Sequence, residues 1–395
     1  MRTLHEAAPG VPPEDLAPAA RSQGGGAAMT GPGTTQAAVS RGQQARAGRA
    51  GSVRFAAGRA LPLFVRGRGS GGARPAFSAD ALRALRARHG GAPVLVRGLS
   101  GAVLVLLDRQ ELRQFYEAEP GTAPRPGPGA VHSRAAVRAV IAEEARHLTA
   151  AATLDLVRAR HAVARAARRI GLGDGADAGD DHPTGLLGRF RRRGAPDGHA
   201  LPGRSAAYAG RAEQALRAVD GIPATVLRTL LLLGTHPAEQ DAAAAEAAGS
   251  GAPEDLPRLR ACVRECLRLY PAVPDLVRVT RTETEWRGVR HPAGTTVLLP
   301  AHFHQRDPEH VPAAHVFVPG RWKTPGAEED IRMAPFGHGP GRCPGDRLGL
   351  LITTALCAEV LRHRRITATR PLLDPPGPLP VALDPRGIRL TLTRR

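Results

Sequence analysis

The sequence predicts a mainly α fold with a minor β-sheet region. Apolar residues recur at helical spacing through most of the chain beyond residue 78, whereas short strand-like runs occur near residues 94–108, 286–300 and 388–395. The chain has 395 residues, of which 42% are hydrophobic, so it can bury a sizeable core. No internal repeat is found.

Residues 1–75 are rich in Gly, Ala, Pro, Gln and Arg and show no sustained periodicity. Such a composition cannot bury enough apolar surface to offset the entropy of ordering. We therefore expect a disordered low-complexity arm over 1–75, followed by one folded domain over 76–395.

The first ordered elements are predicted to be a helix, a hairpin and a short helix. Ser78 is a suitable N-cap for a helix that ends at Gly90. The segment 94–108 is typical of two strands around a Gly-Leu-Ser-Gly turn, and a short helix follows over 111–117. Residues 119–130 are a Pro/Gly-rich breaker.

Four helices are predicted in the middle of the chain. One begins at Ser133, and a second runs over 154–171 before a loop-like stretch to residue 205. A long helix over 208–235 should break near Pro223, which lacks an amide donor. Another helix covers 236–249.

The C-terminal part is predicted to alternate between helix, strand and loop. A helix begins at Pro257, and the runs WRGV (286–289) and GTTVLLP (294–300) are typical of short strands. Loop-rich sequence continues to Pro344, where a helix over 346–364 begins, and the tail has strand character.

The formal net charge is +19 and is carried almost entirely by arginine, because Lys323 is the single lysine. Such a charge suits nucleic acid, an acidic membrane surface or an acidic protein partner, but Arg-rich codon usage explains it equally well. A nucleic-acid binder is disfavoured, since basic residues are not interleaved with aromatic ones. No secretory signal and no apolar run of about 18 residues is found, so we expect a cytoplasmic protein without a membrane span.

The four cysteines fall into two kinds. Cys262, Cys266 and Cys357 lie in apolar helical patterns and are interpreted as core residues of a protein in a reducing compartment. Cys343 instead lies among glycines and prolines. Four histidines also cluster in sequence, but their spacing favours ordinary surface or supporting roles over a metal site. They are His302, His304, His310 and His315.

The stretch from 333 to 352 reads MAPFGHGPGRCPGDRLGLLI and places Cys343 in a glycine-rich loop directly before a helix. Glycines permit positive φ values and a close approach to a flat group. Amides at the start of the helix should stabilise a thiolate. The alternative interpretation of Cys343 is an inert cysteine in a tight turn.

This stretch resembles the cysteine-ligand loop of the cytochrome P-450 family, because Phe336, Gly339, Cys343 and Gly345 have the required spacing. The helix that contains RECLRLYP resembles the family's Glu-x-x-Arg helix, and the segment that ends in VPGRW resembles the one whose arginine completes a salt-bridged triad. The ordered set spans residues 257–352.

The resemblance implies a cytochrome P-450-like fold that is truncated, with haem b as cofactor and Cys343 as the axial ligand of its iron. It assigns Glu265, Arg268 and Arg321 to a structural triad. The residues implied to contact the cofactor are Phe336, Gly339, Arg342, Cys343, Gly345 and Arg278. Arg278 would pair with a haem propionate, with a plain surface arginine as the alternative.

Several positions depart from the family pattern. Gly341 stands where a propionate-binding Arg or His is usual, and Arg342 is the nearest substitute. The acid–Thr pair of the helix over the haem maps onto Asp220 and Gly221, so Thr225 is the substitute hydroxyl. Both tryptophans lie in the C-terminal part, so the family's Trp-x-x-x-Arg propionate helix is missing. The core is therefore expected to be abbreviated around 117–132 and 180–205.

The resemblance implies a haem-thiolate monooxygenase, a monomer that oxidises a small organic substrate with O2. Electrons would come from a ferredoxin-type or other acidic redox partner, which the basic surface suits. Two alternatives stay open because of the departures: a peroxide-driven enzyme, and a degenerate member that is non-catalytic.

Overall fold

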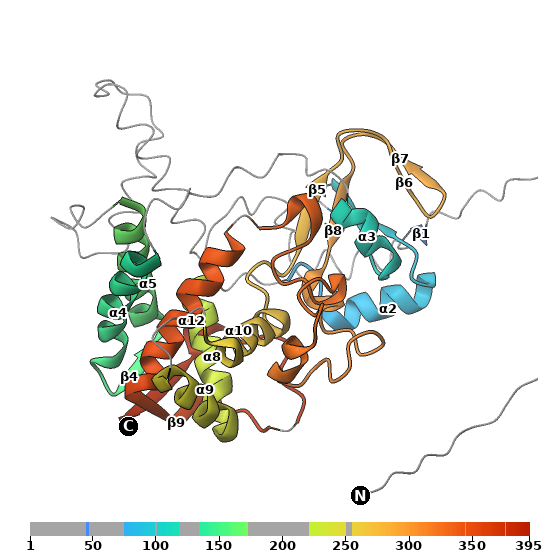
Figure 1. Cartoon of the computed structure of the whole chain (residues 1–395). Helices are drawn as coiled ribbons and strands as arrows, with labels where there is room; N and C mark the ends of the chain where they lie inside the picture. Colours follow the sequence, from blue (N-terminus) through green and yellow to red (C-terminus); the bar gives the residue numbers. More distant parts are fainter. Residues whose placement is uncertain are drawn as a thin grey trace, which may run out of the picture. The chain divides into compact units, whose positions relative to one another are not determined.

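The computed structural model describes residues 45–46, 75–98, 101–117, 134–172, 221–249, 255–343, 345–375 and 377–395 (Figure 1). Contacts divide the chain into residues 1–41 and residues 42–395, and every described residue belongs to the second unit. Most of the predicted arm over 1–75 lies outside the described residues. Its exception is strand β1 (Ala45–Arg46), which pairs with β2, so the prediction of an unstructured arm does not account for these two residues.

A mostly helical core occupies the larger part of the described chain. The helices that build it pack with one another around buried leucines, alanines and cysteines. They are α4 (Arg134–Thr149), α5 (Leu156–Leu172), α8 (Ile222–Thr235), α9 (Pro237–Gly249), α10 (Pro257–Leu269) and α12 (Asp346–His363). Every side chain of α8 from Ile222 to Leu233 is buried, which makes it the central helix of this core.

A five-stranded sheet forms beside a second core, with strand order β1-β2-β3-β8-β5. Its strands besides β1 are β2 (Val94–Gly98), β3 (Gly101–Val105), β8 (Thr296–Leu299) and β5 (Leu276–Val279). Strands β2 and β3 form the predicted antiparallel hairpin, and β3 pairs with β8 in parallel.

The two faces of this sheet are covered by different helices, because alternate side chains point to opposite faces. Val103 and Val105 pack with α2 (Ala79–His89), whereas Leu104 and Leu106 pack with α3 (Gln110–Glu117). The predicted cap of α2 is confirmed: the Ser78 side chain accepts a hydrogen bond from the Ala81 amide, and Gly90 has a φ of 59°.

The sequence prediction was wrong in two places where small sheets form. The run WRGV is not one strand: Arg287 and Gly288 have φ values of 48° and 78° and form the turn between β6 (Thr284–Trp286) and β7 (Val289–His291). Strand β4 (Thr153–Asp155) precedes α5, which therefore begins two residues later than predicted.

Strand β4 belongs to a three-stranded sheet with β10 (Arg389–Arg394) and β9 (Arg364–Arg370). The sequence prediction found β10 but missed β9, as it missed β5 and the short helix α11 (Ala301–His304). Short 3-10 helices lie in the loops: η3 (Pro319–Lys323), η4 (Ile331–Met333), η5 (Gly339–Gly341) and η6 (Pro385–Gly387).

The predicted break at Pro223 coincides with the start of α8, where Pro223 occupies the first turn and its missing amide leaves no bond unmade. The predicted gaps beyond Glu117 and around 180–205 lie outside the described residues, as does Asp220. Among the described residues, no helix combines the length and apolar character needed to cross a membrane.

Candidate functional site

The cysteine loop connects η4 to α12 and is held by its own backbone. The Cys343 amide donates to the Phe336 carbonyl at 2.8 Å, and the Arg342 amide donates to the Gly339 carbonyl at 3.0 Å. Gly337 and Gly339 have φ values of 75° and 61°, which L side chains rarely adopt. The glycines are therefore required by the turn that presents Cys343 directly before α12.

The Cys343 side chain is exposed and carries a free thiol, unlike the buried thiols of Cys262, Cys266 and Cys357. Partial loss of water around its sulfur raises the pKa of the Cys343 thiol, and the charge of Asp346 raises it further. The Gly345 amide and Arg342 oppose this shift. The Gly345 amide acts as expected of an amide at a helix start, because it favours the thiolate, but desolvation outweighs it in the net shift of the Cys343 pKa.

The three residues of the predicted triad lie together, joined at the carboxylate of Glu265. Glu265 and Arg268 are both fully buried on α10, and the Arg268 Nε and Nη2 atoms donate to the Glu265 carboxylate at 2.9 and 2.8 Å. Arg321 on η3 donates from Nε to Glu265 Oε1 at 3.1 Å. Trp322, which the sequence analysis did not include, donates from its indole Nε1 to Glu265 Oε2 at 2.9 Å.

This network fixes the loop-rich segment between α11 and η3. The Arg268 Nη1 atom donates to the carbonyls of Gln305 and Ala314, each at 2.8 Å. Gln305 in turn donates from Nε2 to the Ala334 carbonyl at 3.1 Å, two residues before Phe336. A continuous chain of hydrogen bonds therefore leads from the buried ion pair to the start of the cysteine loop.

The two arginines expected near a cofactor both have protein partners. Arg278 on β5 donates from Nη1 to the Phe115 carbonyl, and its guanidinium lies 4.3 Å from the centroid of the Phe115 ring. Burial lowers the pKa of Arg278. Arg342 donates from Nε to the Asp346 carboxylate at 2.7 Å. A guanidinium has five N–H donors, so the bond to Asp346 leaves donors of Arg342 for an anion.

The structure describes one of the two predicted proton-delivery residues. Asp220 lies outside the described residues. Thr225 is buried in the first turn of α8, where its hydroxyl donates to the Gly221 carbonyl at 2.9 Å. This hydroxyl is thus engaged within its own helix.

The four clustered histidines each have a protein contact, and two of them, His302 and His304, are buried rather than on the surface. His302 Nδ1 contacts the Pro274 carbonyl at 3.1 Å, His304 Nε2 contacts the Leu106 carbonyl at 3.1 Å, and His315 Nδ1 accepts from Arg306 at 3.3 Å. His310 Nε2 lies 3.8 Å from Asp307 Oδ2.

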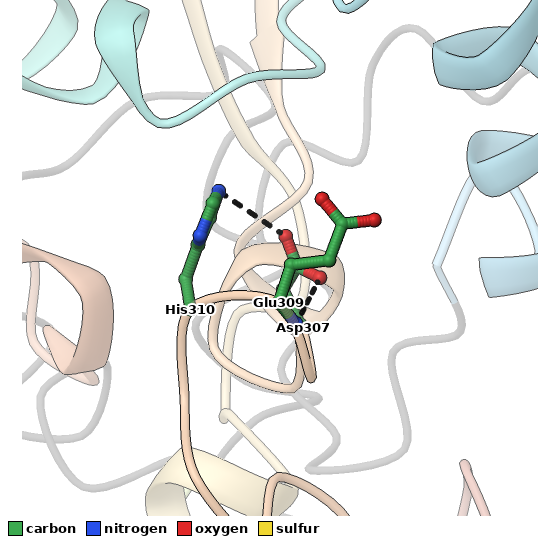
Figure 2. Close-up of side chains that lie close together, drawn as sticks. All are labelled: Asp307, Glu309 and His310. Carbon is green, nitrogen blue, oxygen red and sulfur yellow. Dashed lines mark hydrogen bonds and ion pairs between the residues drawn. The ribbon is translucent and has the colours of Figure 1, made fainter.

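Asp307, Glu309 and His310 are the one group of potential metal ligands that lie together among the described residues (Figure 2). Arg86 already bridges this group, because its guanidinium contacts Asp307 at 2.5 Å and Glu309 at 2.6 Å. A cation would have to displace that guanidinium. The cluster is therefore a group of ion pairs that connects α2 with the turn after α11.

Comparison with known proteins identifies the C-terminal part of the chain. Residues 218–392 match the cytochrome P-450 family model. This part of the chain is therefore similar to the cytochrome P-450 family. A solved structure of a zebra fish cytochrome P-450 with abiraterone aligns with a TM-score of 0.57 at 19% identity, over 80% of this chain and 98% of that one. The fold is thus cytochrome P-450-like.

Two curated relatives are similar over part of the chain. A cyclooctat-9-en-7-ol 5-monooxygenase of Streptomyces melanosporofaciens is 38% identical over 39% of this chain and 38% of its own length. A mitochondrial 25-hydroxyvitamin D-1 alpha hydroxylase of Homo sapiens is 32% identical over 38% of this chain and 32% of its own length. The chain therefore matches about a third of the length of these relatives.

Haem b is the cofactor of this family. The described residues fit it in their donor chemistry: an accessible sulfur stands in a turn whose glycines exclude side chains, and the guanidinium of Arg342 lies next to that sulfur in the chain. An accessible cysteine sulfur, once deprotonated, is the ligand that a thiolate-bound iron requires.

Proposed function

We propose that this chain is a haem-thiolate monooxygenase that oxidises a small organic substrate with O2 and electrons from a redox partner. The observation that carries the proposal is the exposed Cys343 thiol, presented at the start of α12 by a loop that requires glycine at two positions. Cys343 would be the axial ligand, since haem iron held by a thiolate supplies O–O bond cleavage.

The other residues would hold and support the cofactor. Arg278 and Arg342 would donate hydrogen bonds to its carboxylates, and Phe336, Gly339 and Gly345 would form the surface next to its ring. Glu265, Arg268 and Arg321 would act as structural residues, because their bonds end on the backbone that leads into the loop.

The proposed redox partner is inferred from the net charge of the chain. The net charge of +19 suits a ferredoxin-type or other acidic redox partner. We propose a monomeric, cytoplasmic protein that acts on a small organic substrate.

A spectrum of the purified full-length protein tests the proposal. The ferrous–carbon monoxide difference spectrum should show the red-shifted Soret band of thiolate ligation, and Cys343→Ala should abolish it. Cys262→Ala is the matched control, because Cys262 is buried on α10 and should leave the band in place. A colourless protein expressed with abundant haem, or an unchanged band in Cys343→Ala, would refute the assignment.

A second candidate function is peroxide-driven chemistry or loss of turnover. It is favoured by Thr225, whose hydroxyl is bonded to the Gly221 carbonyl and so does not supply a free proton donor in α8. To separate the two candidates, substrate turnover with hydrogen peroxide is compared with substrate turnover with ferredoxin and NADPH. Activity with peroxide alone supports the second candidate, and activity with the electron donors supports the first.

A further inference from the structure

The C-terminal turn of α3 contacts two separate parts of the candidate site. We propose that Phe115 and Tyr116 on this turn are positioning residues, which set the place of the cysteine loop and of Arg278 relative to each other. The inference rests on the proposed function, because it concerns how the ligand Cys343 is held.

The backbone of α3 contacts the backbone of the cysteine loop so closely that no side chain fits between them. A Cβ atom built on Gly339 would lie 2.6 Å from the Tyr116 carbonyl oxygen and 3.3 Å from its carbonyl carbon. Real Cβ atoms do not approach that closely, so the loop can rest on α3 only because residue 339 is glycine. Gly339 begins η5, whose last residue is two positions before Cys343.

The Tyr116 side chain extends this contact. Its ring is 2% exposed and lies edge-on to the His338 ring, with the centroids 6.1 Å apart. The Cys343 amide closes the same loop by donating to the Phe336 carbonyl. Because His338 lies within this closed turn, a displacement of its side chain should also move Cys343.

The same turn of α3 holds Arg278. The Phe115 carbonyl is among the last carbonyls of α3, which have no partner inside the helix, and Arg278 donates to it. The positive guanidinium also complements the negative end of the helix dipole. Arg278 is thereby fixed 4.3 Å from the Phe115 ring, one residue from the contact with the loop.

The turn is itself anchored to the sheet region and cannot drift freely. Glu111 at the start of α3 accepts a bond from Arg287 Nε at 2.5 Å, and Gln114 donates to the Glu285 carbonyl at 2.6 Å. The Cys343 sulfur and the Arg278 guanidinium are both proposed to contact the cofactor. Contacts with the same C-terminal turn of α3 therefore fix the positions of both.

The first test measures the reaction of Cys343 with a chromogenic aromatic disulfide in the full-length chain prepared without haem, because a sulfur bound to iron would not react. Cys343 is the exposed thiol, and the other three cysteines are buried. Tyr116→Ala should release the loop and change the labelling rate at least about threefold, because local opening governs access to the sulfur. Tyr116→Phe keeps the ring and should label at the wild-type rate.

Leu82→Ala controls for general destabilisation. Leu82 is a fully buried residue of α2 in the core on the opposite face of the sheet. It should lower stability and leave Cys343 labelling unchanged under native conditions. Equal labelling of wild type, Tyr116→Ala and Tyr116→Phe, or an equal effect of Leu82→Ala, would overturn the positioning role.

The second test separates contact from backbone strain. Gly339→Ala and Gly90→Ala impose similar strain, with φ values of 61° and 59°, but only residue 339 faces a backbone within 4 Å. Gly339→Ala should reduce the thiolate fraction of the ferrous–carbon monoxide spectrum and alter labelling, and Gly90→Ala should do neither. Absence of the thiolate band in wild type refutes the proposed function, whereas labelling still decides the positioning inference. If Gly90→Ala has the same effects, the positioning inference fails.

Discussion

Glu265 is the carboxylate at the centre of the buried network near the candidate site. Its two oxygens accept bonds from both guanidinium groups of the triad, from the Trp322 indole and from the Val318 amide at 3.0 Å. A single carboxylate therefore forms ion pairs with two arginines, of which Arg268 is wholly buried. Removal of one partner from a buried pair leaves an uncompensated charge, and this is more costly than the pair is favourable.

We predict that Glu265→Gln lowers the free energy of unfolding by about 3–5 kcal/mol, because Gln keeps the shape but not the charge that Arg268 requires. Urea-induced unfolding measures the change. The control is Glu283→Gln, which removes an exposed ion pair with Arg290 and should cost about 0–1 kcal/mol. Equal losses in the two variants would show that the buried network does not stabilise the fold.

His304 gives the protein a pH-dependent stability. Burial lowers the pKa of His304 to about 4, from an unfolded-state value near 6.5. Above pH 6.5 the imidazole is neutral in both states and contributes no pH dependence. As the pH falls from 6.5 to 4 the unfolded chain gains the proton first, so stability decreases by about 3 kcal/mol.

We predict that His304→Gln removes this part of the pH dependence, since Gln can donate to the Leu106 carbonyl but does not titrate in that range. Unfolding by urea at several pH values between 4 and 7 measures it. The variant should show a shallower decline than wild type, with the carboxylates contributing equally to both. Parallel curves would mean that His304 is not buried as a neutral group.

At the scale of elements, α8 packs against β9 without space for a side chain. A Cβ atom on Gly234 would lie 2.6 Å from Ile366 Cγ2 and 2.9 Å from Thr369 Cγ2. Gly349 on α12 is the opposite case, because nothing lies within 4 Å of its Cβ position. Both glycines are inside helices, where Ala has the higher helix propensity.

We therefore predict opposite signs for one substitution at these two positions. Gly349→Ala should raise the free energy of unfolding by up to about 1 kcal/mol through helix propensity. Gly234→Ala should lower it by about 1–3 kcal/mol, because overpacking against β9 outweighs propensity. Thermal and urea unfolding of the two variants measures both signs, and stabilisation by Gly234→Ala would contradict the packing of α8 on β9.

The helices were predictable from the sequence because their periodicity, caps and breakers are local. Ser78, Gly90 and Pro223 each mark a boundary of α2 or α8 by a mechanism that needs no tertiary contact. The missed strands are short and depend on distant partners: β4 forms only because β10 pairs with it. The turn at Arg287 was missed because Arg is an unusual residue at positive φ.

At the scale of the whole molecule, those parts of the candidate site were predictable that depend only on residue identity and sequence spacing. The sequence spacing indicated Cys343 and the three residues that the fold brings together around Glu265. It could not show that Phe115 and Tyr116 meet Arg278 and Gly339, which are more than 150 residues away in the chain. Nor could it give the sign of the Cys343 pKa shift, which depends on how much water the folded loop excludes.

The net charge leads to a prediction about partner association. A chain with a formal charge of +19 attracts an acidic redox protein over distances comparable to the Debye length, which is about 10 Å at 0.1 M salt and about 30 Å at 0.01 M. The bimolecular rate of reduction by an acidic ferredoxin should therefore fall by about tenfold or more between 0.01 and 0.5 M salt. Stopped-flow absorbance measures the rate, and a neutral small-molecule reductant serves as the control, with a rate that salt should hardly change. If the ferredoxin rate is equally insensitive to salt, electrostatic attraction does not guide this encounter, and the arginine excess reflects composition alone.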